Sequence, residues 1–382
     1  MEAYDVIRPL ASGSFGQIFL VRDKQKDELS VLKKISVATL DEKERDSVEQ
    51  EVALLATLYH PNIVAYKGNF LLEREQQLCI LMEFCDSGDL YTYLQKTRKS
   101  QPMGMGAGAG GVDHVHAGSA AGGGPLGAAA EESMLIDWFI QIVSAVQFLH
   151  ARSILHRDLK TQNIFLHSAG QSGTLGSGGG GERESNPTAS TSSATPAHHQ
   201  PPHAHPSRII KLGDFGIAKV LDSSNDNLAR TQIGTPFYMS PEVFKNASYS
   251  YKSDIWGIGC VLYELVCGKH AFGAQSLNGL AVKVLKGKYT PLPNGVKCSK
   301  ELQTLIKSLL SVNPQFRPSI SEMLHLPIIR RKIKNTVKTV TTGLAKSAEE
   351  RVLLQSMYVD QFASLGLGAL FATMMNNHYD GG

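Results

Sequence analysis

His156-Arg157-Asp158-Leu159-Lys160-Thr161-Gln162-Asn163 is the stretch on which the interpretation of this chain depends. It combines a carboxylate that can act as a base, an amide that can bind a metal ion and two fixed cations, Arg157 and Lys160. A solvated turn could carry the same residue types, so the short stretch alone does not separate structure from chemistry. Whether this stretch is a solvated turn or a catalytic loop depends on the partner residues that the rest of the chain supplies.

Composition and charge limit the class of protein. The chain has 382 residues, of which 42% are hydrophobic and 19% charged, which fits a soluble protein with one large domain or two lobes. A net charge of +3 is too small for a protein that follows nucleic-acid phosphates, so no nucleic-acid partner is expected. Five cysteines without a CxxC pair favour a reducing compartment. The N-terminus lacks a signal-peptide core and no apolar tract reaches the ~20 residues of a membrane span, so we expect a cytoplasmic protein.

The first part of the chain is predicted to be a strand-rich lobe with one helix. Short apolar runs are separated by turn residues, which is typical of strands. One segment opens with charges and then carries apolar residues at helical spacing. The expected strands are 4–11, 17–23, 29–35, 63–72 and 77–84, and the expected helix is 41–59, ended by His60-Pro61-Asn62.

Two low-complexity segments interrupt the second part of the chain. Residues 99–130 are rich in Gly and Ala, and residues 168–207 are rich in Gly, Ser, Pro and His. Such segments bury too little apolar surface to offset their ordering entropy, so both are expected to be disordered insertions. The second insertion lies between two strand-like runs, 164–166 and 209–212, at the tip of an expected hairpin. Helical patterns fill the remainder, apart from a tail, 330–382, that is basic and then amphipathic.

Three further motifs supply partners for the His156–Asn163 loop. Ala11-Ser12-Gly13-Ser14-Phe15-Gly16 lies between two expected strands, where glycines let backbone N–H groups approach a phosphate. Lys33 lies on an otherwise apolar strand and needs an anionic partner. Glu51 in the following helix is the candidate, and two unrelated surface charges are the alternative. Asp214-Phe215-Gly216 follows a strand-like run.

In this order the motifs resemble the protein-kinase signature set, and the matching residues extend from Leu10 to Arg317 outside the two insertions. The resemblance implies an α+β bilobal kinase fold over residues 4–329. A small β-rich N-lobe with one helix would cover 4–83, a hinge 83–86, and a larger, mainly helical C-lobe 87–329.

The resemblance also implies roles for single residues in phosphoryl transfer from Mg-ATP to protein substrates. Asp158 would accept or orient the proton of the substrate hydroxyl, and Lys160 would stabilise the transferred phosphoryl group. Lys160 at this position is typical of Ser/Thr kinases. Lys33, paired with Glu51, would orient the α- and β-phosphates. Mg²⁺ is assigned to Asn163 and Asp214, and ATP to Leu10, Ala11, Gly13, Gly16, Ile18, Lys33, Glu83 and Cys85.

Regulation is expected in the polar segment after Gly216. Arg157, next to the catalytic Asp158, would attract a phosphate, and the resemblance makes Thr231 the expected phosphorylation switch. Thr235 matches a family position whose hydroxyl contacts Asp158 and Lys160. Elsewhere Asp254 would bind the backbone of the catalytic loop. Arg317 would form a buried pair with Glu242.

The wording of several motifs is similar to that of the NIMA-related kinases: Thr161-Gln162-Asn163-Ile164-Phe165-Leu166 and the stretch from Gly234 to Glu242 carry this resemblance. It suggests a cytoskeletal location at a centrosome, cilium or flagellum. Two alternatives stay open. Ala11, which replaces the family's first glycine, and the insertions could indicate a pseudokinase scaffold, and the tail could mediate self-association or docking.

Overall fold

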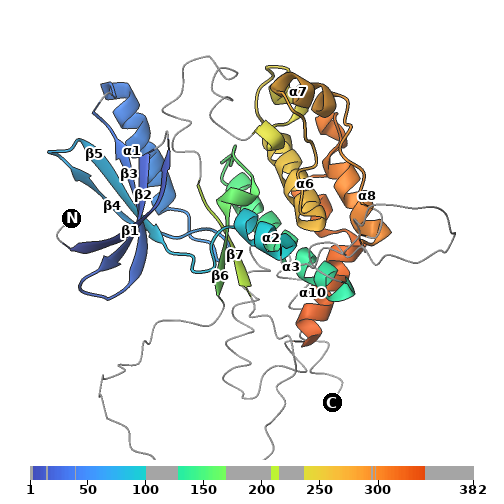
Figure 1. Cartoon of the computed structure of the whole chain (residues 1–382), viewed down its shortest axis with the longest axis horizontal. Coiled ribbons are helices and arrows are strands. Elements are labelled where there is room, and N and C mark those ends of the chain that lie inside the picture. Colours follow the sequence, from blue (N-terminus) through green and yellow to red (C-terminus); the bar gives the residue numbers. More distant parts are fainter. Residues whose placement is uncertain are drawn as a thin grey trace, which may run out of the picture.

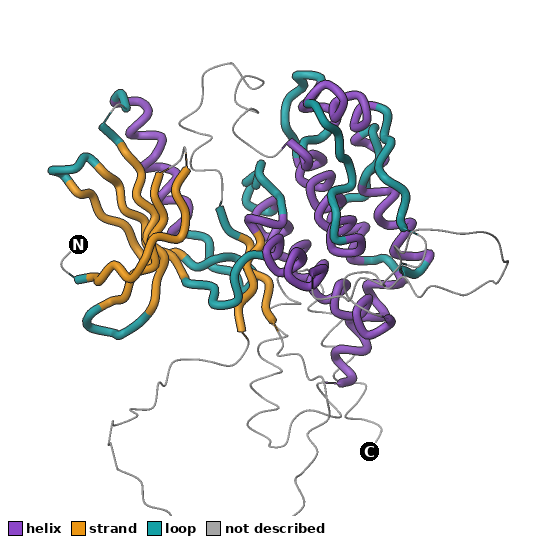
Figure 2. Tube along the Cα trace, viewed as in Figure 1, coloured by secondary structure: helices purple, strands orange, loops and turns teal. Residues whose placement is uncertain are grey.

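The computed structural model describes residues 3–13, 16–38, 40–99, 128–168, 208–214, 236–293, 296 and 298–339. They form a sheet-rich lobe and a helical lobe that lie side by side (Figure 1). Strands dominate the first lobe and helices the second when the chain is coloured by secondary structure (Figure 2). The expected α+β bilobal architecture is confirmed.

The N-lobe contains one antiparallel sheet with the strand order β1-β2-β3-β5-β4. One face of the sheet buries a small apolar cluster of Val21, Leu32, Cys79 and Leu81, and the other face packs toward the helix α1. Because successive side chains of a strand point to opposite faces, the strands contribute residues to both apolar clusters. The elements are β1 (Tyr4–Gly13), β2 (Gly16–Asp23), β3 (Leu29–Ser36), α1 (Glu42–Ala56), β4 (Tyr66–Leu72) and β5 (Gln77–Glu83).

Two boundaries in the N-lobe differ from the sequence prediction by three residues, and the other boundaries differ by two or fewer. The helix α1 ends at Ala56 rather than at 59, because both the backbone N–H and the hydroxyl of Thr57 donate to the carbonyl of Leu54, at 2.9 and 2.7 Å. The strand expected from residue 63 begins only at Tyr66. Ile63 instead forms an isolated parallel bridge with Leu212 of the C-lobe.

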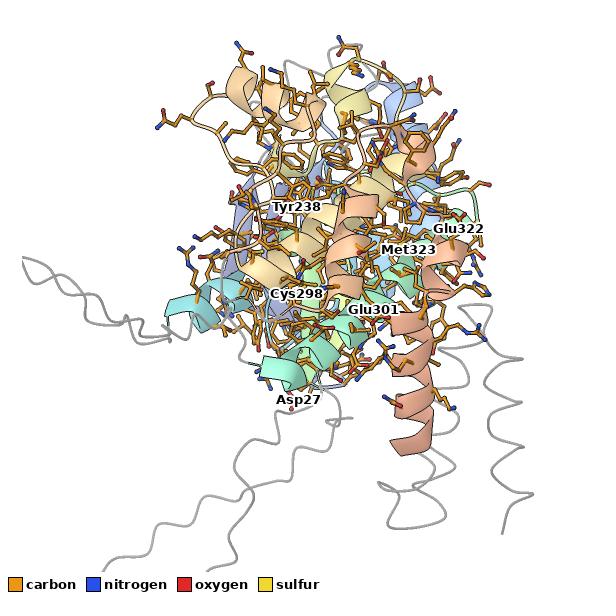
Figure 3. All side chains as sticks on the ribbon, turned by 90° about the vertical axis from the view of Figure 1, so that its right-hand side faces the viewer. Asp27, Tyr238, Cys298, Glu301, Glu322 and Met323 are labelled. Carbon is orange, nitrogen blue, oxygen red and sulfur yellow. The ribbon has the colours of Figure 1, made fainter. Side chains whose placement is uncertain are left out.

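The helix α6 forms the centre of the C-lobe, and its residues from Ser253 to Cys267 are all buried. It packs against α3 and α8, as the views in Figures 1 and 3 show. The elements of this lobe are α2 (Leu90–Lys99), α3 (Ala128–His150), η1 (Thr161–Asn163), β6 (Ile164–Ser168), β7 (Arg208–Leu212), η3 (Pro236–Tyr238), α5 (Pro241–Phe244), α6 (Tyr251–Cys267), α7 (Leu277–Leu285), α8 (Lys300–Leu309), η4 (Pro314–Phe316), α9 (Ile320–Leu324) and α10 (Pro327–Thr339).

The helix α3 begins at Ala128, inside the segment 99–130 that was expected to be disordered. Its stretch Glu132–His150 is the one helical segment of the described residues that is long and apolar enough to cross a membrane. Of that stretch 67% is buried within the protein, which is the pattern of a core helix. Lys99 ends α2 and Ser168 ends β6, and the remaining residues of the two insertions lie outside the described part of the chain.

The hairpin of β6 and β7 is bonded both to the chain that leaves the hinge and to the α1–β4 loop of the N-lobe. Leu166 of β6 accepts from the N–H of Ser87 at 3.0 Å and donates to the carbonyl of Gly88 at 2.8 Å. Leu212 of β7 donates to the carbonyl of Asn62 at 2.8 Å. The hairpin thereby fixes the loop before β6 and the residues after β7 relative to the hinge.

The start of the tail is folded, so residue 329 does not end the ordered structure. The helix α10 buries Ile328, Ile329 and Ile333, and the Nζ of Lys332 lies 2.8 Å from Asp137 of α3. An apolar stripe and an ion pair therefore hold this basic helix against the lobe. The amphipathic helix expected at 348–374 lies outside the described residues.

Candidate active site

Three of the predicted catalytic and metal-binding residues meet in the loop between α3 and β6. The Oδ2 of Asp158 accepts a hydrogen bond from the Nζ of Lys160 at 2.8 Å and one from the Nδ2 of Asn163 at 2.9 Å. Nδ2 of Asn163 also donates to the carbonyl oxygen of Asp158 at 2.9 Å. The orientation of the Asp158 carboxylate is therefore fixed from within its own loop.

Asp254 of α6 holds this loop from below, as the sequence predicted. Its oxygens accept the backbone N–H groups of His156 at 3.0 Å and Arg157 at 3.1 Å, the side chain of His150 lies at 2.8 Å, and the hydroxyl of Tyr249 donates at 2.6 Å. Burial alone would raise the pKa of the Asp254 carboxyl, but these hydrogen bonds and the nearby imidazole of His156 hold the pKa below its ordinary value. An ionised carboxylate thus fixes the backbone ahead of Asp158.

Two residues of the site adopt a left-handed backbone conformation. Arg157 has φ 65° and Asp214 has φ 54°, a region that side chains other than glycine rarely occupy. Such residues cost about 1–3 kcal/mol each and persist where the surroundings determine them. At Arg157 the hydrogen bond from its N–H to Asp254 helps to hold this backbone conformation.

Lys33 connects the two lobes. It lies on β3, is only 6% exposed, and its Nζ is 2.9 Å from the Oδ1 of Asp214, which follows β7. The site therefore gathers the predicted lysine of the N-lobe and the predicted metal ligand of the C-lobe. Glu51 lies in α1, but its side chain is outside the described residues, so its pairing with Lys33 stays a prediction.

The glycine-rich turn joins β1 to β2, where Gly13 pairs with Gly16. Gly16 has φ 117°, and a Cβ there would lie 1.9 Å from the carbonyl oxygen of Lys34, so only glycine fits. Ala11 pairs with Ile18 directly after a register shift between Pro9 and Ala11, and it is not among the described residues with positive φ. Replacement of the family's first glycine by alanine therefore leaves the strand pairing intact.

The hinge residues Glu83 and Cys85 are enclosed by the C-lobe hairpin and the start of β4. The carboxylate of Glu83 lies 3.0 Å from the Nζ of Lys211 and accepts from the N–H of Ala65 at 3.0 Å. Burial, followed by the charge of Glu83, raises the pKa of the Cys85 thiol to about 12. Cys85 is thus a protonated, buried side chain that packs as a small hydrophobic group, as its sequence context indicated.

A buried ion pair supports the C-lobe beneath the site. Arg317 donates to both carboxylate oxygens of Glu242, at 2.7 and 2.8 Å, and its guanidinium lies 5.0 Å from the ring of Trp256. Ser253 also donates to Glu242 at 2.6 Å. The predicted pairing of Arg317 with Glu242 is confirmed, and its bidentate geometry is the strong form of this interaction.

Other predicted residues are placed less fully. Leu10 and Ile18 lie on the paired strands β1 and β2, on either side of the glycine-rich turn. Thr231 and Thr235 lie outside the described residues, as do Phe215 and Gly216 that follow Asp214, so the expected phosphorylation switch stays a prediction.

The sequence analysis missed a network below the catalytic loop. Thr161, Tyr238 and Glu264 are hydrogen-bonded to one another, and Figure 3 marks Tyr238 among the side chains of the C-lobe. One available signal was a single acidic residue, Glu264, inside the otherwise apolar run of α6.

Comparison with known proteins agrees with this geometry. Residues 4–329 match the family model of the protein kinase domain. The chain is 36% identical over 345 residues to serine/threonine-protein kinase Nek4 of Mus musculus, which covers 90% of this chain and 35% of that protein. It is also 36% identical over 346 residues to the probable serine/threonine-protein kinase nek3 of Dictyostelium discoideum, covering 90% of this chain and 25% of that one.

A human relative, serine/threonine-protein kinase Nek5, is 34% identical over 333 residues, which cover 87% of this chain and 37% of that protein. The chain thus spans little more than a third of these relatives at most. Their Nek names confirm the resemblance to NIMA-related kinases. Because the family model extends from the first strand of the N-lobe to the start of α10, the chain belongs to the protein kinase family.

Proposed function

We propose that this chain is a serine/threonine protein kinase of the NIMA-related group, which transfers the γ-phosphate of ATP to Ser or Thr hydroxyls of protein substrates. One observation carries the proposal. Asp158, Lys160 and Asn163 form a hydrogen-bonded cluster, and the ion pair of Lys33 with Asp214 joins the two lobes at the other predicted part of the site. Each residue type matches a task that phosphoryl transfer requires.

The residues present fit Mg²⁺ and ATP, which protein kinases use in general. Asp214 offers a carboxylate and Asn163 an amide, the hard oxygen donors that Mg²⁺ prefers. Because the Nδ2 of Asn163 donates to Asp158, a cation would be bound through the other atom of the amide, Oδ1. The close approach of Gly16 to the carbonyl of Lys34 requires glycine at this end of the turn, and glycines let backbone N–H groups approach a phosphate.

The chain's own residues explain how the transfer would be assisted. Asp158, oriented by Lys160 and Asn163, accepts or orients the proton of the substrate hydroxyl. Lys160, 2.8 Å from Asp158, places a cation beside that hydroxyl and so favours the negative charge of the transferred group. Lys33, held by Asp214, is buried and preorganised to bind phosphate oxygens. Mg-ATP, when bound, supplies the phosphoryl group and a metal that offsets its charge.

The test measures transfer of labelled phosphate from ATP to casein and to matched peptides with Ser, Thr or Tyr as the acceptor. We expect transfer to Ser and Thr peptides, little transfer to the Tyr peptide, and loss of transfer in Asp214→Ala. Negligible transfer by both the unaltered protein and Asp214→Ala would favour the pseudokinase scaffold. No observation on the described residues favours that alternative.

Activation and location are further parts of the proposal. We propose that phosphorylation of Thr231 activates the enzyme, on the basis of Arg157 beside Asp158, and full activity of purified Thr231→Ala would contradict it.

A cytoskeletal location at a centrosome, cilium or flagellum follows from the NIMA-related resemblance. Fluorescence microscopy of the tagged chain tests this, and a uniform cytoplasmic signal would count against it.

Self-association or docking through the tail is the remaining proposal. The basic helix α10 is held against α3 of its own lobe, so the surface in question is the rest of the tail, 340–382. Light scattering would compare the full chain with a variant that ends after Thr339. Identical monomeric masses would argue against self-association.

A further inference from the structure

Thr161 belongs to the catalytic loop, but it has no role in the phosphoryl transfer proposed above. It directly follows Lys160, begins η1 and is completely buried. Its Oγ1 lies 2.9 Å from the hydroxyl oxygen of Tyr238 and 3.2 Å from the Oε2 of Glu264, and the Tyr238 hydroxyl donates to the same Oε2. Three polar side chains that are remote in the sequence therefore meet at one point.

Each partner comes from a functionally different part of the fold. Tyr238 ends η3, in the segment that follows Thr235, so it belongs to the region expected to lie near the protein substrate. Glu264 belongs to α6, the helix that also carries Asp254. The same buried helix thus holds the catalytic loop at two points, at Arg157 through Asp254 and at Thr161 through Glu264.

The chemistry of the junction requires a hydroxyl at position 161. Glu264 is 1% exposed, and a buried carboxylate needs hydrogen-bond donors. Burial, followed by the charge of Glu264, raises the pKa of Tyr238. The phenol therefore stays neutral and donates a hydrogen bond to the carboxylate. The hydroxyl of Thr161 is the part of the catalytic loop that can bond to both groups. Valine has the same shape but no such group.

We propose that Thr161 is a positioning residue for phosphoryl transfer, whose hydroxyl ties the catalytic loop to the segment 236–238 and to α6. It acts through its neighbour Lys160, which bonds to Asp158, and through Asn163 at the other end of η1. Loss of the Thr161 hydroxyl makes Lys160 and Asn163 less firmly positioned relative to the substrate hydroxyl that accepts the phosphoryl group. The N-lobe is left unchanged. This inference rests on the proposed function and assigns a further residue to the same site.

The test compares Thr161→Val with the conservative Thr161→Ser in steady-state phosphorylation of a Ser peptide. We expect kcat to fall about tenfold in Thr161→Val, the size of one or two net hydrogen bonds, while KM for ATP changes by less than about twofold. Thr161→Ser keeps the hydroxyl and should recover most of kcat. A merely structural role would lower only the amount of folded enzyme, so kcat is calculated per folded enzyme, as determined by circular dichroism, and on that basis would stay unchanged.

A double-mutant cycle with Tyr238→Phe tests whether the hydroxyls act together. If they share one network, the kcat loss in the double variant is smaller than the product of the two single losses. Should Thr161→Val fail to fold, Tyr238→Phe alone decides. A lowered kcat with unchanged KM for ATP then supports the proposal, and an unchanged kcat overturns it.

Ser144→Ala is the matched control. Ser144 of α3 is also fully buried, and its hydroxyl lies 3.2 Å from a ring nitrogen of His60, away from the catalytic loop. It should lower thermal stability without changing kcat of the folded enzyme. If the unaltered protein transfers phosphate and Thr161→Val retains its kcat, the role of Thr161 is refuted. If the unaltered protein transfers none, the proposed function itself fails.

Discussion

Removal of the Arg317 guanidinium tests the support beneath the active site most directly. Besides its two bonds to Glu242, Arg317 donates to the carbonyl oxygens of Ser311 at 2.8 Å and Lys252 at 2.6 Å. Arg317 also donates to the carbonyl oxygen of Val312 at 3.3 Å, so Arg317→Ala deprives a buried carboxylate of its cation and three carbonyls of this donor. Breaking one partner of a buried pair costs about 3–5 kcal/mol, and we expect that loss in the free energy of unfolding near neutral pH.

The dependence on pH provides a second, sharper signature. In the unaltered protein burial tends to raise the pKa of the Glu242 carboxyl, but hydrogen bonds from Arg317 and Ser253 and the charge of Arg317 hold the pKa below its ordinary value of 4.5. This carboxyl therefore stabilises the fold above its unfolded pKa, and the stabilisation is lost as the pH falls through the lowered folded pKa.

The variant should show the opposite sign. Without Arg317, burial dominates and the folded pKa of Glu242 rises above the unfolded value. Protonation of this group then favours the folded state. The gap in stability between Arg317→Ala and the unaltered protein must accordingly narrow as the pH falls toward and below the ordinary carboxyl pKa.

Urea unfolding followed by far-ultraviolet circular dichroism, repeated at several pH values, measures both effects. Arg331→Ala is the matched control, because Arg331 pairs with Glu301 on the surface, with side chains 56% and 46% exposed, and such pairs contribute about 1 kcal/mol or less. The reasoning is refuted if Arg317→Ala is no more destabilising than Arg331→Ala. A stability gap that stays constant with pH would refute the account of Glu242.

Three further outcomes follow from the site. Asp158→Asn should lower kcat by about 10²–10⁴-fold with little change in thermal stability, as measured by peptide phosphorylation and calorimetry, and a retained kcat would remove Asp158 from the proton transfer. Gly16→Ala should raise KM for ATP, because the new Cβ would collide with the carbonyl of Lys34 at a left-handed φ; unchanged nucleotide titrations would contradict this. Cys85, with a pKa of about 12, should resist iodoacetamide at mildly alkaline pH until the protein is unfolded, and rapid labelling of Cys85 in the folded protein, read by mass spectrometry, would show that its thiol is not buried as described.

Local patterns were enough to predict much of this fold and part of the site. The strand-rich lobe, the hairpin after the catalytic loop and the helical character of the C-lobe all follow from apolar periodicity and turn residues. The contacts of Asp254 with the loop backbone, and of Arg317 with Glu242, were predicted by resemblance because both depend on residues in fixed motifs.

Contacts that depend on side chains meeting from remote elements could not be predicted in this way. Thr161 is ordinary in its local context, and although Glu264 is an acidic residue in an apolar run, only the packing of η1 on α6 identifies Thr161 as its partner. The basic composition of α10 did not show which surface, if any, this helix would contact. Its buried isoleucines and the pair of Lys332 with Asp137 become visible only once α3 is in place.

The attachment of the β6–β7 hairpin to the α1–β4 loop and to the chain beyond the hinge has a mechanical consequence. If one flexible segment alone joined the lobes, they could rotate about it freely, and a distortion of one lobe would not be transmitted to the other. Here the strand before Asp214 is bonded to the α1–β4 loop of the N-lobe, while the strand after the catalytic loop is bonded to Ser87 and Gly88 beyond the hinge, so a relative rotation of the lobes must twist the hairpin. Torsional stiffness of these two short strands therefore contributes to how far Lys33 and Asp214 can separate during turnover.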